Sequence, residues 1–403
     1  MEKRIKTNIL IEFDNFTETV NGMMQFANTI KDKYPIKVRC VNSCKVSIKL
    51  IEWSDVVLSI RSTNQITARI SQICKKYNRF FIYQLDDNLF LHKNDELFKK
   101  IRIKYLKQTI ENADVFLSSN PNLNTYVSEK CNIHRFARMD TAANEEEIHK
   151  WRISGNNKIK IVFYSNAGNG QWFRDILMPI LPKLTKMTNK KIEIQLLGIN
   201  EMDCLGECKI KYVPHMSLKE FKTYLWKQNF DIGVAPLPDN DEFCKCKYFN
   251  KFMEFTMAGI PGVYSNCIPY TTVVENGKNG FLCNSKEEWL SALYKLIEDY
   301  NLRQKIVENA QELLRTTFSY ANIEKRIIED IPELITFKAT EKVRGCLLPV
   351  KWNYIILLFM DKVNASYRYL RNGGIRAFCR RIKEYTIIMM QRKEEKARNE
   401  NSD

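Results

Sequence analysis

Long apolar runs are missing from this sequence of 403 residues. The most apolar stretch, 354–360, has about a third of the roughly 20 residues that a membrane-spanning helix needs, which excludes a bilayer crossing there. The opening segment, MEKRIKTNILIEF, has no apolar stretch long enough for a secretory signal. We therefore expect a protein that stays in the cytoplasm.

Glycine and proline are also scarce, at 14 and 11 residues, and no low-complexity linker occurs, so we expect disorder only at the ends. Twelve cysteines without an export signal indicate reduced thiols rather than a disulfide framework. The pairs Cys204/Cys208 and Cys244/Cys246 lack a standard zinc-ligand spacing. Small buried side chains are the favoured interpretation, and we predict no metal site.

The net charge of +16 implies an anionic partner: nucleic acid, a phosphate-bearing substrate or a membrane surface. Residues 338–403 contain 15 Lys/Arg and 7 Asp/Glu, so this segment carries half of the excess charge. Nucleic acid is the disfavoured partner, because no aromatic-basic binding module of the usual kinds occurs.

Apolar runs of strand length alternate with helical patterns along most of the chain, which predicts parallel sheets with crossover helices. The first series of runs lies at 9–13, 36–41, 56–60, 80–85 and 115–118. The second series lies at 160–164, 192–198, 210–213, 231–235 and 262–264. We therefore predict an α/β fold of two Rossmann-like, doubly wound domains that face a cleft, at 1–145 and 158–335, followed by a helical basic tail at 338–403.

A predicted helix at 248–257 follows the strand at 231–235 and a polar loop. A helix start after a strand favours anions, because free backbone amides and the helix dipole point there. Lys247 lies at the mouth of this helix, and Lys251 and Glu254 share one of its faces. These residues can hold a diphosphate and a ribose together; the alternative is an ordinary surface ion pair with a solvated Lys247.

Two other segments contain candidate site residues. Gly168 and Gly170 lie in a loop that opens a helix, where backbone amides can approach phosphate, and Arg174 lies one turn further. Asp86 and Asp87 follow the strand at 80–85, and two adjacent carboxylates at a strand end are costly unless something uses them. The alternatives are a solvated Arg174 and a capping or turn role for the acids. Because position 88 is Asn, no DxD metal motif is present.

The segment 231–282 resembles the donor-binding region of GT-B glycosyltransferases of family 4, the retaining bacterial surface-polysaccharide enzymes. The residues that carry the resemblance are DIGVAPL at 231–237, Lys247 and Lys251 with Glu254, GIPGVYS at 259–265, Pro269-Tyr270, and Asn276-Gly277 with Gly280. The resemblance is specific over about 110 residues, from 192 to 303, and is weaker over the first domain. Many members have a Glu eight positions before the ribose-binding Glu, where this sequence has Cys246.

The resemblance implies a role for each candidate residue. Glu254 binds the donor ribose, the amides near Lys247 and Tyr248 face the donor sugar and diphosphate, and Arg174 neutralises the leaving diphosphate. Gly22 approaches the transferred sugar, His215 lies near the base, and Asp86 and Asp87 face the cleft.

The implied function is transfer of a sugar from a UDP- or GDP-sugar to a lipid-linked or surface glycan, with retention and without an obligatory metal. Two alternatives stay open: a degenerate, non-catalytic partner subunit, favoured by Cys246, and a sugar-nucleotide epimerase, disfavoured by the four histidines without a motif. The aromatic and basic tail predicts peripheral attachment to the anionic inner face of the cell membrane. Its alternative is packing on the first domain.

Overall fold

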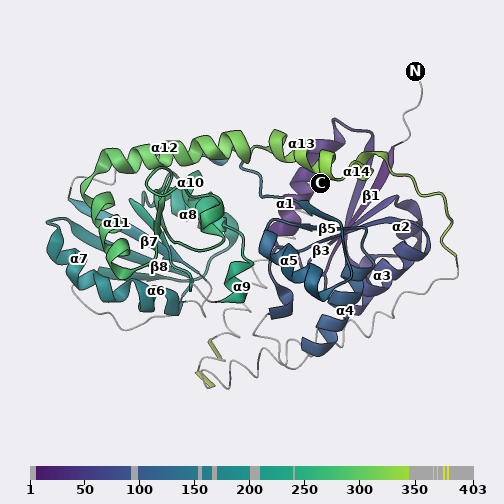
Figure 1. Cartoon of the computed structure of the whole chain (residues 1–403), viewed down its shortest axis with the longest axis horizontal. Coiled ribbons are helices and arrows are strands. Elements are labelled where there is room, and N and C mark those ends of the chain that lie inside the picture. Colours follow the sequence, from purple (N-terminus) through teal and green to yellow (C-terminus); the bar gives the residue numbers. More distant parts are fainter. Residues whose placement is uncertain are drawn as a thin grey trace.

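The computed structural model describes residues 6–91, 99–152, 157–165, 170–199, 209–238 and 241–344, and single residues at 366, 370, 375, 376, 379 and 380. Within them the chain forms two six-stranded parallel sheets, with the strand orders β2-β1-β3-β4-β5-β6 and β12-β11-β10-β7-β8-β9 (Figure 1). The predicted α/β fold with two doubly wound sheets is confirmed.

The strands have the following bounds. The first sheet contains β1 Thr7–Phe13, β2 Ile36–Asn42, β3 Val56–Ile60, β4 Phe80–Gln84, β5 Val115–Ser118 and β6 Phe136–Arg138. The second sheet contains β7 Lys158–Tyr164, β8 Lys191–Leu197, β9 Lys209–Val213, β10 Ile232–Ala235, β11 Gly262–Ser265 and β12 Phe281–Cys283. β6 and β12 are absent from the prediction, because three residues are too few to produce a recognisable apolar run.

Helices flank both sheets. Those on the first sheet are α1 Glu18–Lys31, α2 Ile48–Trp53, α3 Gln65–Lys76, α4 Lys99–Glu111, α5 Pro121–Lys130, α13 Tyr320–Asp330 and α14 Glu333–Thr336. Those of the second domain are α6 Gly170–Ile176, α7 Leu181–Met187, α8 Leu218–Lys227, α9 Glu242–Lys245, α10 Asn250–Met257, α11 Lys286–Glu298 and α12 Tyr300–Thr317. Short 3-10 turns are η1 Ser43–Lys45, η2 Leu89–Leu91, η3 Glu145–Glu147, η5 Met178–Ile180 and η6 Tyr270–Thr272.

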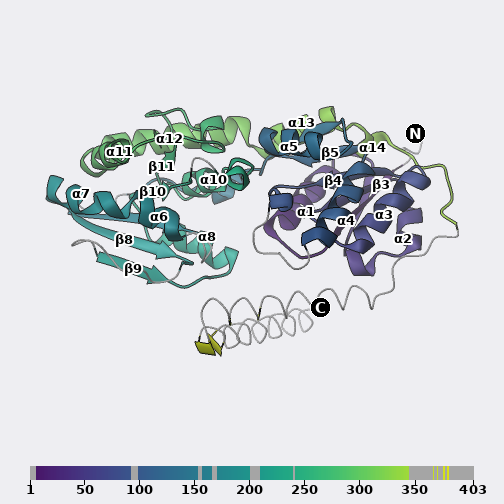
Figure 2. The ribbon, with the colours of Figure 1, turned by 60° about the horizontal axis from the view of Figure 1, so that its bottom comes forward.

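Successive strand residues point to opposite faces of a sheet, and both faces are apolar here. In β4, Phe81 and Tyr83 pack with α3 and α4, whereas Phe80 and Ile82 pack on the side of α1 and α13. Figure 2 shows α3 and α4 lying along the first sheet. This double covering explains why the strand segments are nearly continuous apolar runs in the sequence.

The chain returns to the first domain after completing the second. Helix α12 extends from the second domain toward the first, and α13 and α14 then pack on the first sheet (Figure 1). Ile323, Ile327 and Ile331 of this returning segment are buried in the first-domain core, where α13 contacts β6 and α14 contacts β1. The predicted second domain spans residues 158–335. Its last residues, from 320 onward, follow the second domain in sequence but pack on the first domain.

The predicted tail, 338–403, lies mostly outside the described residues. At its start, the Lys338 ammonium lies 3.3 Å from an Asp55 carboxylate oxygen. Arg79 donates a hydrogen bond of 2.7 Å to the backbone oxygen of Glu341, and Val343 is buried in the first-domain core. The chain up to residue 344 is therefore part of the first domain's packing. Within the described ranges, no helix has the length and apolar character needed to span a membrane.

Candidate functional site

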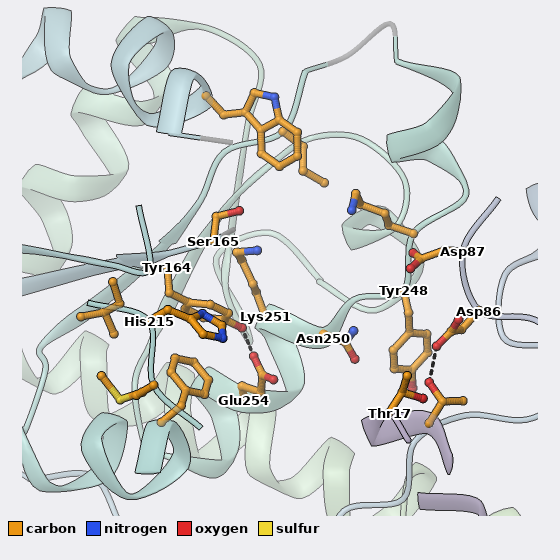
Figure 3. A pocket seen from close by; sticks show the side chains of 18 of the residues that line it. Thr17, Asp86, Asp87, Tyr164, Ser165, His215, Tyr248, Asn250, Lys251 and Glu254 are labelled. Atoms are coloured by element: carbon orange, nitrogen blue, oxygen red, sulfur yellow. Dashed lines mark hydrogen bonds between the residues drawn. The ribbon is translucent and has the colours of Figure 1, made fainter. Parts of the chain in front are cut away.

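A cavity of about 500 Å³ lies between the two domains, where strands of both sheets end (Figure 3). Open parallel sheets place ligands at this edge. The first domain contributes Thr17, Thr19, Arg61, Asp86 and Asp87. The other described lining residues come from the second domain: Tyr164, Ser165, Trp172, Leu197, Gly198, Pro214, His215, Met216, Phe221, Leu237, Lys247, Tyr248, Asn250, Lys251, Glu254 and Tyr270. We call this space the interdomain cavity.

Glu254 and Lys251 lie on one face of α10, and both side chains line the interdomain cavity (Figure 3). The Tyr164 hydroxyl, at the end of β7, donates a hydrogen bond to a Glu254 carboxylate oxygen. The Lys251 ammonium lies 4.7 Å from the centre of the Tyr164 ring. Burial, and then the charge of Lys247, lower the pKa of Lys251 from 10.5 to about 8. A carboxylate and a weakly basic cation therefore share this wall.

Lys247 and Tyr248 precede α10 in a loop that the first domain holds. The buried Asn120 side-chain amide donates hydrogen bonds of 3.0 and 2.7 Å to the backbone oxygens of Lys245 and Lys247. The Lys247 ammonium lies 4.6 Å from the centre of the Phe243 ring. The position of Lys247 in the second domain therefore depends on a first-domain residue that the sequence did not reveal.

Cys246 lies in the same loop and faces away from the interdomain cavity. Its side chain is buried in the first-domain core, and the Asn88 amide donates a 3.6 Å hydrogen bond to its sulfur. Burial raises the pKa of the Cys246 thiol, which favours the neutral form. A glutamate in this orientation would place a charge in an apolar contact between domains. Glu242 is the acidic residue closest to Cys246 in the sequence. Its carboxylate pairs with Lys245 at 2.7 Å on the protein surface.

Asp86 and Asp87 form an acidic wall opposite α10. The Thr19 hydroxyl donates a hydrogen bond to Asp86, and the Arg61 guanidinium pairs with Asp86 and, at 3.3 Å, with Asp87. Burial raises the pKa of the Asp86 carboxyl, and the charge of Arg61 opposes that rise. Arg61 therefore offsets part of the cost of placing two carboxylates together, and both acids line the cavity rather than only capping a turn.

Arg61 is a site residue that the prediction missed. It follows β3 directly, at the same sheet edge as the acids, and has a left-handed backbone with φ of +53°. A positive φ is uncommon for a residue with a side chain and marks a constrained position. A cation directly after a buried strand was a signal available in the sequence.

His215 lines the far end of the interdomain cavity, beside the turn after β8. Gly198 in that turn has φ of +72°, and a Cβ there would lie 2.7 Å from the Ser165 backbone oxygen. Only glycine therefore lets the chain pass this close to β7. A Cβ on Gly198 would also lie 3.6 Å from the His215 Nδ1 atom, so the turn and His215 are close neighbours. The placement of His215 near a nucleotide base stays a prediction.

Three of the predicted residues do not line this cavity, and a fourth lies outside the described residues. Arg174 is exposed on α6, because its neighbour Phe173 points into the core and Trp172 takes the position facing the cavity. Gly170 is buried at the start of α6 and does not line the cavity. Gly168 lies outside the described residues. Gly22 lines a neighbouring cavity instead.

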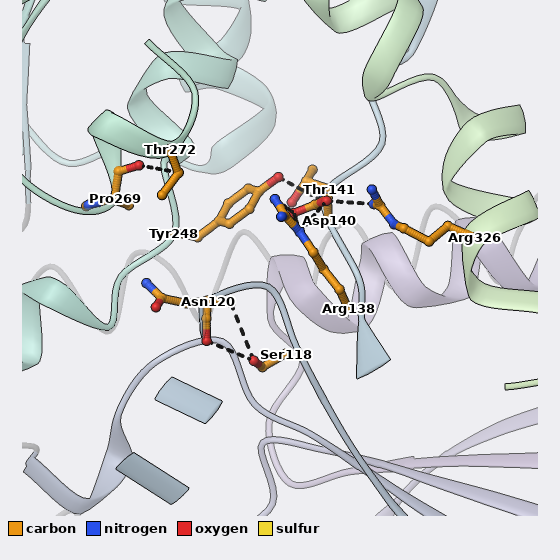
Figure 4. Close-up of polar contacts among 9 residues, drawn as sticks. All are labelled: Ser118, Asn120, Arg138, Asp140, Thr141, Tyr248, Pro269, Thr272 and Arg326. Atoms are coloured by element: carbon orange, nitrogen blue, oxygen red, sulfur yellow. Dashed lines mark hydrogen bonds and ion pairs between the residues drawn. The ribbon is translucent and has the colours of Figure 1, made fainter. Parts of the chain in front are cut away.

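Tyr248 joins the interdomain cavity to the segment between the domains (Figure 4). Its hydroxyl oxygen accepts a 3.2 Å hydrogen bond from the backbone N–H of Thr141. The adjacent Asp140 carboxylate is buried and pairs with Arg138 at 2.9 Å and with Arg326 of α13 at 2.6 Å. Burial raises the pKa of Tyr248 well above 10, so the phenol stays protonated.

Among the described residues, no group of three or more His, Cys, Asp or Glu side chains could hold a metal ion. Cys204 and Cys208 lie outside the described ranges, whereas Cys244 and Cys246 are buried.

Comparisons with known proteins define the fold class. No protein-family model matches the sequence, and no curated protein matches it. Solved structures do match: the two facing parallel sheets with an interdomain cavity are the GT-B fold of glycosyltransferases. Because identities lie between 10% and 15% for the structures named below, the likeness shows the fold alone.

Three structures illustrate the similarity. Sucrose-phosphate synthase from Thermosynechococcus elongatus has a TM-score of 0.59 at 10% identity, covering 82% of this chain and 99% of its own. HepE of Anabaena, in complex with UDP and glucose, has a TM-score of 0.58 at 15% identity, with 81% and 100% covered. An α-glucosyltransferase in complex with UDP and DNA has a TM-score of 0.56 at 11% identity, with 81% and 100% covered.

Proposed function

We propose that this chain is a glycosyltransferase that moves a sugar from a UDP- or GDP-sugar to a glycan acceptor. The observation that carries the proposal is the placement of Glu254 and Lys251 on one face of α10, opposite the acids Asp86 and Asp87. Such a cavity offers a carboxylate for hydroxyl groups and cations for phosphate. Support also comes from two proteins of the same fold, HepE and the α-glucosyltransferase, which were solved with UDP.

The proposed donor spans the second-domain wall. Glu254 accepts hydrogen bonds from the two vicinal ribose hydroxyls, and the nucleotide base lies toward His215. Lys251 and Lys247 face the diphosphate, with Tyr248 beside the donor sugar. Charged groups fixed in a partly buried cavity can stabilise a departing diphosphate by several kcal/mol without reorganising.

The proposed reaction keeps the anomeric configuration, as in the family 4 enzymes that the sequence resembles. The acceptor oxygen bonds to the anomeric carbon on the face from which the diphosphate departs, and the acceptor proton passes to the diphosphate. Asp86 and Asp87 orient the hydroxyl groups of the reacting sugars rather than bind the nucleotide. Positioning of two substrates supplies much of the acceleration in such a step.

Release of UDP or GDP tests the proposal against the two alternatives. We expect purified protein to hydrolyse one sugar nucleotide slowly when no acceptor is present. A non-catalytic partner subunit would release no nucleotide. An epimerase would convert the donor into a second sugar nucleotide without net release.

Lys251 gives the donor site a pH dependence. Its pKa of about 8 is depressed in the free protein, and a bound diphosphate favours the ammonium form, which raises that pKa. Below about pH 8, Lys251 is already protonated in the free protein, so donor binding takes up no proton and the donor affinity is highest. The donor affinity falls as pH rises through 8, because binding must then protonate Lys251. Titration calorimetry between about pH 7 and 9 should show donor affinity falling by up to about tenfold per pH unit above 8.

The Lys251→Arg variant is the matched control for this pH effect. Arginine keeps its charge throughout this range. We expect the donor affinity of Lys251→Arg to stay constant above pH 8. The measured binding enthalpies are corrected for buffer ionisation. An equal fall in both proteins would assign the pH dependence to another group.

We also propose that the basic tail attaches the enzyme to an anionic membrane face, where lipid-linked acceptors are found. The support is compositional: aromatic and aliphatic residues at 352–360 are followed by an arginine-rich stretch at 368–383. We expect the full chain to float with anionic vesicles only and to dissociate at high salt. Because residues 338–344 pack on the first domain, the control is a chain that ends after Arg344. Unchanged binding by that shortened chain would show that the tail is not the anchor.

A further inference from the structure

A second cavity, of about 190 Å³, adjoins the interdomain cavity. The two share Thr19, Asp86, Tyr248, Asn250 and Glu254 as lining residues. The second cavity extends from this boundary between α1 and α10, toward α13. A ligand in the second cavity would therefore lie next to a nucleotide-sugar donor in the interdomain cavity, with Asp86 at the boundary between them.

Gln84, the last residue of β4, lines this second cavity and carries a buried hydrogen-bonding group that has no partner among the described residues. It follows Phe80 and Ile82 on the α1 side of the sheet, so its side chain reaches the cavity beneath α1. Gln84 as a residue is only 6% exposed, and among the described residues its Oε1 atom has no hydrogen-bond partner. Buried amide oxygens are almost always paired, so an unpaired one needs an explanation.

The walls of the second cavity suit a neutral sugar. Amide and hydroxyl groups of Gln84, Asn21 and Ser119 line it together with the apolar side chains of Met23 and Phe26. Amides and hydroxyls match sugar hydroxyl groups, whereas apolar side chains match the C–H face of a ring. The volume lies below the roughly 300 Å³ of drug-sized sites, which limits the ligand to about one ring.

Charge argues against a phosphate in the second cavity. Lys222 is the only cationic side chain among its described lining residues, and it pairs with Glu147 at 2.8 Å. Asp86 and Asp140, in the same lining, are already paired with arginines, and Glu254 adds a further carboxylate. The described lining therefore offers a second nucleotide or a phosphate group no cation that lacks an acidic partner, whereas an uncharged polyhydroxyl ligand needs none.

We infer that the second cavity binds the terminal sugar of the acceptor glycan, with the Gln84 amide accepting a hydrogen bond from one of its hydroxyls. The inference rests on the proposed function, since it assigns the second substrate of the same reaction. Asp86, at the boundary of the two cavities, then lies beside the hydroxyl that attacks the donor. Gln84 is a specificity-determining residue for the acceptor and has no contact with the nucleotide.

The test compares wild type with Gln84→Leu and with the control Gln72→Leu, which changes a glutamine of the same domain outside both cavities. Each protein is saturated with UDP or GDP and titrated with glucose, galactose, mannose and N-acetylglucosamine, using saturation-transfer NMR. We expect at least one sugar to bind wild type and Gln72→Leu saturably, and to bind Gln84→Leu about tenfold more weakly. Nucleotide affinity should be equal in all three proteins.

Thermal unfolding of the ligand-free proteins supplies a second readout. Removing an unpaired buried amide should leave the melting temperature of Gln84→Leu unchanged or raised. A clear decrease would show that Gln84 has a structural role, and equal sugar binding by all three proteins would overturn the inference. Absence of sugar binding to nucleotide-saturated wild type would also overturn it, while leaving the donor site intact. Failure of both nucleotides to bind would instead remove the proposed function itself.

Discussion

Replacing Glu254 with glutamine is expected to weaken binding of the nucleotide-sugar donor by about 1.5 to 3 kcal/mol, on the order of 10- to 150-fold in Kd. In the proposed complex, the carboxylate accepts two ribose hydroxyl bonds, whereas an amide offers one acceptor oxygen and a misplaced donor. The glutamine can still accept the hydrogen bond from Tyr164, so folding should be unaffected. Titration calorimetry with the donor that wild type binds measures the effect.

Glu275→Gln is the matched control, because Glu275 is an exposed glutamate of the same domain that pairs only with a surface lysine, Lys278, among the described ion pairs. Its donor affinity should equal that of wild type. If Glu254→Gln also binds the donor with unchanged affinity, the ribose assignment is wrong.

Asp86→Asn is expected to lower turnover by about 100-fold while changing donor affinity little. Asp86 lies at the boundary of the two cavities and is held by Thr19 and Arg61, so its loss disturbs the reacting hydroxyl rather than the nucleotide. Asp87→Asn should act in the same direction, since Asp87 shares the pairing with Arg61. Steady-state release of UDP or GDP with saturating donor gives the turnover.

The control for this pair is Asp32→Asn, an exposed residue at the end of α1. It should keep wild-type turnover. Wild-type turnover in both Asp86→Asn and Asp87→Asn would leave the two acids with a purely structural role.

Much of the fold could be predicted from the sequence, because strands covered on both faces are continuous apolar runs. The β3 and β4 residues are all buried, and both strands were placed within one residue of their observed ends. The returning helices were not foreseen, since the amphipathic pattern at 320–336 does not specify which domain its apolar face covers. An amphipathic pattern predicts a helix and the face of that helix that is buried, but it does not predict which domain covers that face.

The candidate site was predictable where its residues are close in sequence. Lys251 and Glu254 share a helix face, and spacing alone placed them together. Arg61 left a signal in the sequence, a cation directly after a buried strand, which was overlooked. Gln84 reaches the second cavity through the meeting of different strand ends, which no local pattern records. Arg174 is exposed and is not among the described residues that line the cavity. Its sequence position revealed a loop and a helix start but not the direction of the helix face.

The central claim is that the interdomain cavity binds a nucleotide-diphosphate sugar. Thermal unfolding of wild type and Glu254→Gln with a panel of UDP-, GDP-, dTDP- and CMP-sugars tests it most directly. We predict that one UDP- or GDP-sugar, at about 100 times its Kd, stabilises wild type by about 2.7 kcal/mol and stabilises Glu254→Gln much less at the same concentration. Stabilisation by none of the nucleotide-diphosphate sugars at millimolar concentration would contradict the claim.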